Sequence, residues 1–176
     1  MLLFTLCYFS CQQYCSLATA AILLYTAPAF VVVMSALLWR EPVTRRKLLA
    51  LGLAFLGCTF VSGVWRGGLS VSPTGLILGL GSALFYALYS IFGRYALRGS
   101  PPMTVVLYTF VFAGGGALLV GDPGAVASAL AADGRLLALA VGLAALSTAL
   151  PYVLYTWGLS RVESGKASIL ASVEPV

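Results

Sequence analysis

Residues 17–47 of this 176-residue chain read LATAAILLYTAPAFVVVMSALLWREPVTRRK. The first part, Leu17 to Trp39, holds 23 residues without a charge, and roughly 20 apolar residues suffice for a helix that crosses a membrane. Pro28 lies inside this run and removes a backbone N–H from it. Charged residues return from Arg40 to Lys47. The stretch therefore predicts a membrane span, a break within the span and a charged loop at its end.

The composition of the whole chain fits an all-α polytopic membrane protein. Hydrophobic residues make up 61% of the sequence and charged residues only 9%, whereas about 25% is typical of a soluble domain. The net charge is +5, but the basic residues are scattered between apolar runs rather than interleaved with aromatics along a stripe. We therefore expect a lipid bilayer, and no nucleic acid, as the surroundings of this chain.

Apolar runs and charged loops alternate along the chain and predict about seven membrane spans. Residues 16–19 are expected to form a turn, and residues 121–135 a loop. The loops after the second, fourth and sixth spans carry eight of the ten Lys and Arg residues, so these loops are predicted to lie in the cytoplasm. The predicted spans are residues 1–15, 20–39, 48–65, 75–92, 103–120 and 136–159, and a last one that starts near residue 167.

A weak internal repeat relates the two ends of the chain. A shift of 147 residues places the first span on the sixth and the second on the seventh. Because five spans separate the two copies, an odd number, the copies are predicted to run in opposite directions, as in many secondary transporters. The repeat predicts a ten-helix 5+5 protein, of which this chain is a fragment truncated at both ends. The identical pairs are Leu3/Leu150, Tyr8/Tyr155, Ala20/Ala167, Ile22/Ile169, Leu23/Leu170 and Pro28/Pro175.

Three segments resemble the EamA-type drug/metabolite transporter (DMT) superfamily. They are TAAILLYTAPAFVVVMSALLWREP, LGLAFLGCTFVSG and, near the end of the chain, ASILASVEPV. The resemblance implies that residues 1–66 are the last three helices of a first repeat, residues 67–74 a connecting loop and residues 75–176 the first four helices of a second repeat. It also implies export or exchange of small metabolites, such as amino acids, across the plasma membrane by alternating access.

Three prolines are hinge candidates. Pro28 and Pro175 fall in register in the two repeats, and each frees a carbonyl that should face protein or a water-filled cavity. Thr26 is expected to help satisfy the freed backbone near Pro28. Pro151 is the third candidate, and Phe4 occupies the corresponding place in the first repeat. The alternative is that all three are ordinary kinks that serve packing.

Polar residues within the spans are candidates for a substrate path. Glu174 is the only acid placed in a span, and a carboxylate in the membrane is costly unless it faces a cavity or a partner. It is predicted to be a substrate or proton site, or else a structural carboxyl bonded to backbone. Aromatic residues near span ends can instead serve as interfacial anchors. The further path candidates are Tyr86, Tyr155, Gln12, Gln13 and Tyr25.

No cofactor or metal site is expected. Cys7, Cys11 and Cys15 share one helix face, but their spacing matches no standard metal pattern, and packing is the interpretation we adopt. The chain has no histidine and no catalytic motif, so an enzyme is not expected. The alternatives to a transporter are a non-transporting membrane assembly subunit and a polytopic membrane enzyme, and a homodimer is left open. The small residues Gly75, Gly79 and Ala83 form a ridge that is predicted to let helices approach closely.

Overall fold

The computed structural model describes residues 1–61 and 72–171, and the regular elements of these residues are helices. The long, apolar segments predicted from the sequence account for most of them. In order, the helices are α1 (Leu2–Tyr14), α2 (Leu17–Leu24), α3 (Ala27–Trp39), α4 (Arg45–Val61), α6 (Pro73–Ala96), α7 (Pro102–Val120), α8 (Pro123–Ala132), α9 (Gly134–Gly142), the π-helix η1 (Leu143–Ala149), α10 (Leu150–Leu159) and α11 (Ser164–Ala171).

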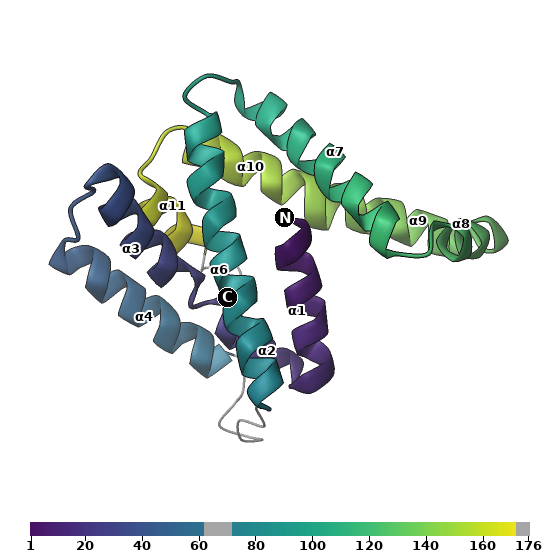
Figure 1. Ribbon diagram of the computed structural model, residues 1–176, viewed down its shortest axis with the longest axis horizontal. Helices are drawn as coiled ribbons and strands as arrows, with labels where there is room; N and C mark the ends of the chain where they lie inside the picture. The colour runs from purple at the N-terminus through teal and green to yellow at the C-terminus, as the bar shows by residue number, and fades with distance from the viewer. Residues whose placement is uncertain (62–71, 172–176) are drawn as a thin grey trace.

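Helix α6 is the central element of the arrangement. It starts at Pro73, and the Ser72 hydroxyl accepts a hydrogen bond from the Gly75 N–H at 3.0 Å, as expected of an N-cap. Helices α1, α2, α3, α10 and α11 all pack against it. Figure 1 shows α3, α4 and α11 on one side of α6 and α1 on the other. Because Gly75, Gly79 and Ala83 are buried on α6, the predicted small-residue ridge does lie at a helix contact.

The span that contains Pro28 consists of two helices. Helix α2 ends at Leu24, Tyr25 and Thr26 form a turn, and Pro28 occupies the first turn of α3, where a missing N–H costs nothing. The Thr26 hydroxyl donates to the Leu23 carbonyl at 2.6 Å. The expected turn over residues 16–19 is wrong, because Ser16 caps α2 by accepting from the Thr19 N–H, and the helix already begins at Leu17.

Residues 121–135 are not the loop that we expected. They hold the ten-residue helix α8, which lies at the far end of the arm formed by α7, α9 and α10 (Figure 1). The Asp122 carboxylate accepts from the Ala125 N–H at 3.0 Å, and Pro123 occupies the first turn. A cap, a proline and a run of alanines are strong local helix signals, and they outweigh the polar residues at the two ends of the segment.

The predicted sixth span contains a π-helix. The 26 residues from Gly134 to Leu159 form one apolar helical segment, but the seven residues of η1 in its middle are wound as a π-helix. Pro151 follows directly and has no N–H to donate to the carbonyl one turn before it. The Thr148 hydroxyl donates to the Leu143 carbonyl, five residues back, at 3.3 Å. The π-helix therefore accommodates the hydrogen bond that Pro151 cannot donate.

Four helical segments of the described residues are long and apolar enough to cross a membrane: Leu17–Trp39, Pro73–Ala96, Pro102–Val120 and Gly134–Leu159. Large apolar side chains cover their outer faces, and Leu119 and Phe112 of α7 are 88% and 75% exposed. Such faces suit a lipid solvent, which removes the penalty that water would impose on them. The chain is thus an integral membrane protein in its described part.

Candidate functional site

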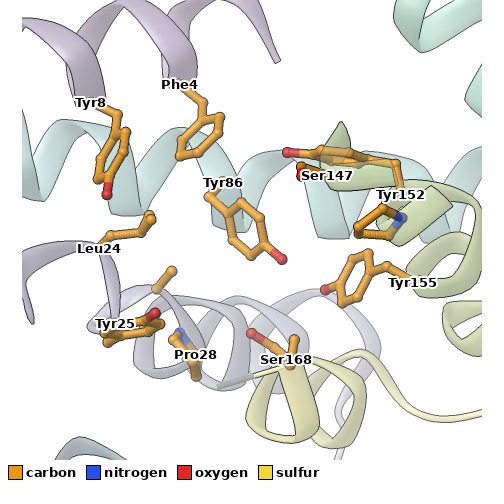
Figure 2. Close-up of a pocket in the computed structure, with 13 residues that line it drawn as sticks. Phe4, Tyr8, Leu24, Tyr25, Pro28, Tyr86, Ser147, Tyr152, Tyr155 and Ser168 are labelled. Carbon is orange, nitrogen blue, oxygen red and sulfur yellow. The ribbon is translucent and has the colours of Figure 1, made fainter. Parts of the chain in front are cut away.

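A cavity of about 610 Å³ lies between α6 and helices from both ends of the chain. Helix α1 contributes Phe4 and Tyr8, the broken span contributes Tyr25 and Pro28, and α6 contributes Tyr86. Figure 2 shows these side chains grouped around one space. The π-helix, α10 and α11 complete the lining through Ser147, Pro151, Tyr152, Tyr155, Ser168 and Ala171.

The aromatic side chains of the cavity are held in place by contacts with one another. The ring of Tyr86 lies 5.5 Å from that of Phe4 and 6.1 Å from that of Tyr155, measured between centroids. Tyr155 shares a hydrogen bond of 2.8 Å with Ser90 of α6. Tyr89, also on α6, shares a hydrogen bond of 3.1 Å with Thr156 of α10. These bonds tie α6 to α10 and fix the rings, which is the preorganisation that a binding site needs.

The chemistry of the cavity is aromatic and hydroxyl-rich. Among the described residues that line it, none carries a charge. Phenol and serine hydroxyls can donate or accept hydrogen bonds, and ring faces attract apolar groups and cations. Mostly apolar walls with a few convergent polar groups are the usual make-up of a small-molecule site.

The structure brings five of the sequence candidates together and leaves two apart. Tyr25, Tyr86 and Tyr155 line the cavity, as do the hinge candidates Pro28 and Pro151. Gln12 and Gln13 are not among the lining residues: Gln12 is half-buried near the end of α1, and Gln13 is exposed. Both follow Tyr8 by at least one helical turn, beyond the part of α1 that faces the cavity. Glu174 and Pro175 lie outside the described residues.

Several lining residues were not among the sequence candidates: Phe4, Tyr8, Tyr152, Ser147 and Ser168. Their own residue types carry no signal that separates them from other aromatic or small residues in spans. The internal repeat holds one usable signal for Tyr8, because the 147-residue shift places it on Tyr155.

Residues related by the repeat line the same cavity. Three pairs separated by 147 residues all belong to its lining, and they come from α1 and α10 or from α2 and α11. The pairs are Phe4 with Pro151, Tyr8 with Tyr155, and Leu24 with Ala171. The cavity is thus built from corresponding positions of the two segments that the shift relates.

A cavity between apolar helices, lined from both ends of the sequence by described residues that carry no charge, defines a polytopic membrane protein with an internal small-molecule site. Residues 1–63 and 73–176 match the EamA-like transporter family. The chain belongs to this family, which is a family of transporters rather than of enzymes.

Similar proteins include transporters from archaea and bacteria. An "Uncharacterized transporter" of Archaeoglobus fulgidus is 32% identical over 171 residues, which is 96% of this chain and 58% of that protein. The threonine/homoserine exporter RhtA of Salmonella typhimurium is 32% identical over 160 residues, 90% of this chain and 51% of the exporter. The chain therefore spans about half the length of the curated relatives it matches.

A solved structure shares the fold. A crystal structure of a protein superposes on this chain with a TM-score of 0.72 at 20% identity, covering 98% of this chain and 60% of the other. At this level of identity the likeness concerns the fold alone, and it extends across both the α1–α4 part and the α6–α11 part.

Proposed function

We propose that the protein to which this chain belongs exports small, polar organic metabolites such as amino acids across the cell membrane, by alternating access between two inverted five-helix repeats. In this proposal residues 1–66 and 75–176 belong to different repeats, and the cavity between them holds the substrate. Membership of a transporter family and the exporter RhtA among the relatives support the direction and the kind of substrate.

One observation carries the proposal: the cavity is lined by repeat-related pairs. If the two repeats exchange conformations during transport, a site on the pseudo-symmetry axis stays in contact with the substrate in both states. The presence of the pairs Tyr8/Tyr155 and Leu24/Ala171 in the lining supports such a site. A non-transporting assembly subunit has no need of a preorganised cavity of about 610 Å³.

The size and lining of the cavity narrow the substrate. Its volume falls within the 300–1,000 Å³ range of ordinary small-molecule sites. Since no described lining residue is charged, a phosphorylated substrate would have no cation to pair with, and its desolvation would be costly. A neutral or zwitterionic molecule can be held by tyrosine and serine hydroxyls.

Counterflow of radiolabelled L-threonine in proteoliposomes that contain the complete protein tests the proposal. Tyr86→Phe removes one hydroxyl from the cavity, and the loss of a neutral hydrogen bond, about 0.5–1.5 kcal/mol, should raise the KM roughly 2- to 12-fold. Tyr95→Phe is the matched control, because Tyr95 lies on the same helix, is 67% exposed and lines no part of this cavity. Wild-type kinetics in Tyr86→Phe, or the absence of flux for a panel of amino acids, would contradict it.

A further inference from the structure

A cluster of charged side chains joins four segments at one end of the helix arrangement. Glu41 follows α3, Lys47 lies in the first turn of α4, Arg94 lies in the last turn of α6, and Glu163 and Ser164 lie at the start of α11. None of these residues lines the cavity. The cluster is therefore a feature separate from the candidate site.

Contacts within the cluster connect the part of the chain before residues 67–74 with the part after them. The Lys47 ammonium lies 3.6 Å from a Glu41 carboxylate oxygen and 2.7 Å from a Glu163 carboxylate oxygen. Arg94 pairs with the other oxygen of Glu41 and donates to the Ser164 hydroxyl at 3.1 Å. Both Lys47–Glu163 and Arg94–Glu41 cross between the two parts.

Local backbone geometry delivers Glu41 into this position. Arg40 ends α3 in the left-handed conformation with φ 53°, which turns the chain back on the helix. The Glu41 N–H then donates to the Ser35 carbonyl at 3.4 Å. The side chains of Glu41 and Lys47 are each only 8% exposed. Charges buried to this extent are tolerated because each has a partner of opposite sign.

The cluster lies just beyond the cavity along the helices. Ser164 precedes the cavity residue Ser168 by four residues, about 6 Å along a helix, and Arg94 follows Tyr86 by eight residues, about 12 Å. Helix α11 also packs closely on α3 here, because a Cβ at Gly165 would lie 3.2 Å from Val32. The loops that carry the charges are the ones predicted to be cytoplasmic from their excess of Lys and Arg.

We infer that Glu41, Lys47, Arg94 and Glu163 form an ionic gate that closes the cytoplasmic end of the cavity by tying the two repeats together. The inference rests on the proposed alternating-access function. When the cavity opens toward the cytoplasm, the Lys47–Glu163 and Arg94–Glu41 pairs separate and each charge becomes hydrated. Glu163 and Arg94, 34% and 27% exposed, already reach water and are the members that leave first.

A cysteine in the cavity wall reports whether this end is closed. Ala171→Cys provides the reporter, in the complete protein with all of its native cysteines replaced by alanine. A membrane-impermeant maleimide is added from the cytoplasmic side of sealed inside-out vesicles. Glu163→Gln removes the pair with Lys47 at nearly constant volume and should raise the labelling rate about tenfold or more. Lys166→Gln is the matched control. Lys166 also pairs with Glu163, at 3.5 Å, but the two residues are only three positions apart, so this pair does not connect the two parts of the chain. The labelling rate of this variant should stay within twofold of the parent's rate.

The double variant Lys47→Gln/Glu163→Gln covers the case in which Glu163→Gln fails to fold. It removes both members of the bridging pair and leaves Glu41 with Arg94, so that no unpaired buried charge remains. It should label as fast as the single variant. If the folded variants label at the parent's rate, the cluster is a static contact and the gate inference is overturned. Labelling needs no substrate, so this result is independent of the flux assay, and its failure would leave the transport proposal standing.

Discussion

A methyl group has no room at Gly79, where α6 meets α2. A Cβ at this position would lie 2.4 Å from Leu23 Cδ1 and 2.8 Å from Leu23 Cβ. The first contact could be relieved by a rotamer change, but Cβ of Leu23 is attached to the backbone of α2. Gly79→Ala must therefore push α2 away from α6, and α2 is the first half of the broken span that lines the cavity. At Gly81, on the same helix, the nearest atom would be Cys7 Sγ at an ordinary 3.8 Å.

The comparison of Gly79→Ala with Gly81→Ala isolates the cost of this close approach. Both variants gain the same helix propensity, so their difference reports packing, and overfilling a packed contact costs about 1–3 kcal/mol. For a chain of this size that corresponds to a Tm roughly 2–12 °C lower for Gly79→Ala. Thermal unfolding in detergent, followed by circular dichroism, measures it. Equal Tm values would show that α2 and α6 are not packed as described.

Three further predictions follow from the hinge, the cluster and the topology. Pro151→Ala restores a helical N–H beside the π-helix, so it should let the segment rewind as an α-helix and slow counterflow more than it weakens substrate binding. The hydrogen bond from Lys47, helped by the charges of Lys47 and Lys166, holds the pKa of Glu163 below its usual 4.5. The Lys47–Glu163 pair therefore stabilises the fold above the usual pKa of a glutamate, and this stabilisation is lost as the pH falls through the lowered pKa. The Tm should stay level from pH 8 to about 5 and decrease at lower pH, and Glu163→Gln should make that decrease smaller. Cysteines placed at Arg98 and Asp133 should label from opposite sides of the membrane, and labelling from one side would contradict the alternating spans.

Much of the helical framework could be predicted because its signals are local. Charged loops, uncharged runs and the Ser72–Pro73 start of α6 all act over a few residues, and the helices begin and end close to the expected positions. Helix α8 also has a local start signal in Asp122 and Pro123, but the polar residues at the two ends of the segment favour a loop prediction. Tyr86 and Tyr155 were predicted to face a cavity because they lie within spans rather than at span ends.

The remaining features are not fixed by local sequence patterns. A helix can accommodate a proline by a kink or by a change in winding, and the residues around Pro151 do not indicate that the result is the π-helix of residues 143–149. The charges near residues 40–47 predicted the side of the membrane but not which pairs form. Those pairs require the left-handed turn at Arg40 and the approach of α11 to α4, and neither is encoded in a local pattern.

The shared position of Lys47 between two carboxylates limits how this chain can diverge. Losing Lys47 alone would leave Glu41 and Glu163 facing a common, partly dry space without the cation between them. Losing Glu163 alone would leave Lys47 with one partner instead of two. Drift at one of these positions therefore creates pressure for a compensating change at the other, although 116 residues of sequence separate them. Related proteins should accordingly keep or exchange these residues as a set, in the way that base pairs covary in a folded RNA.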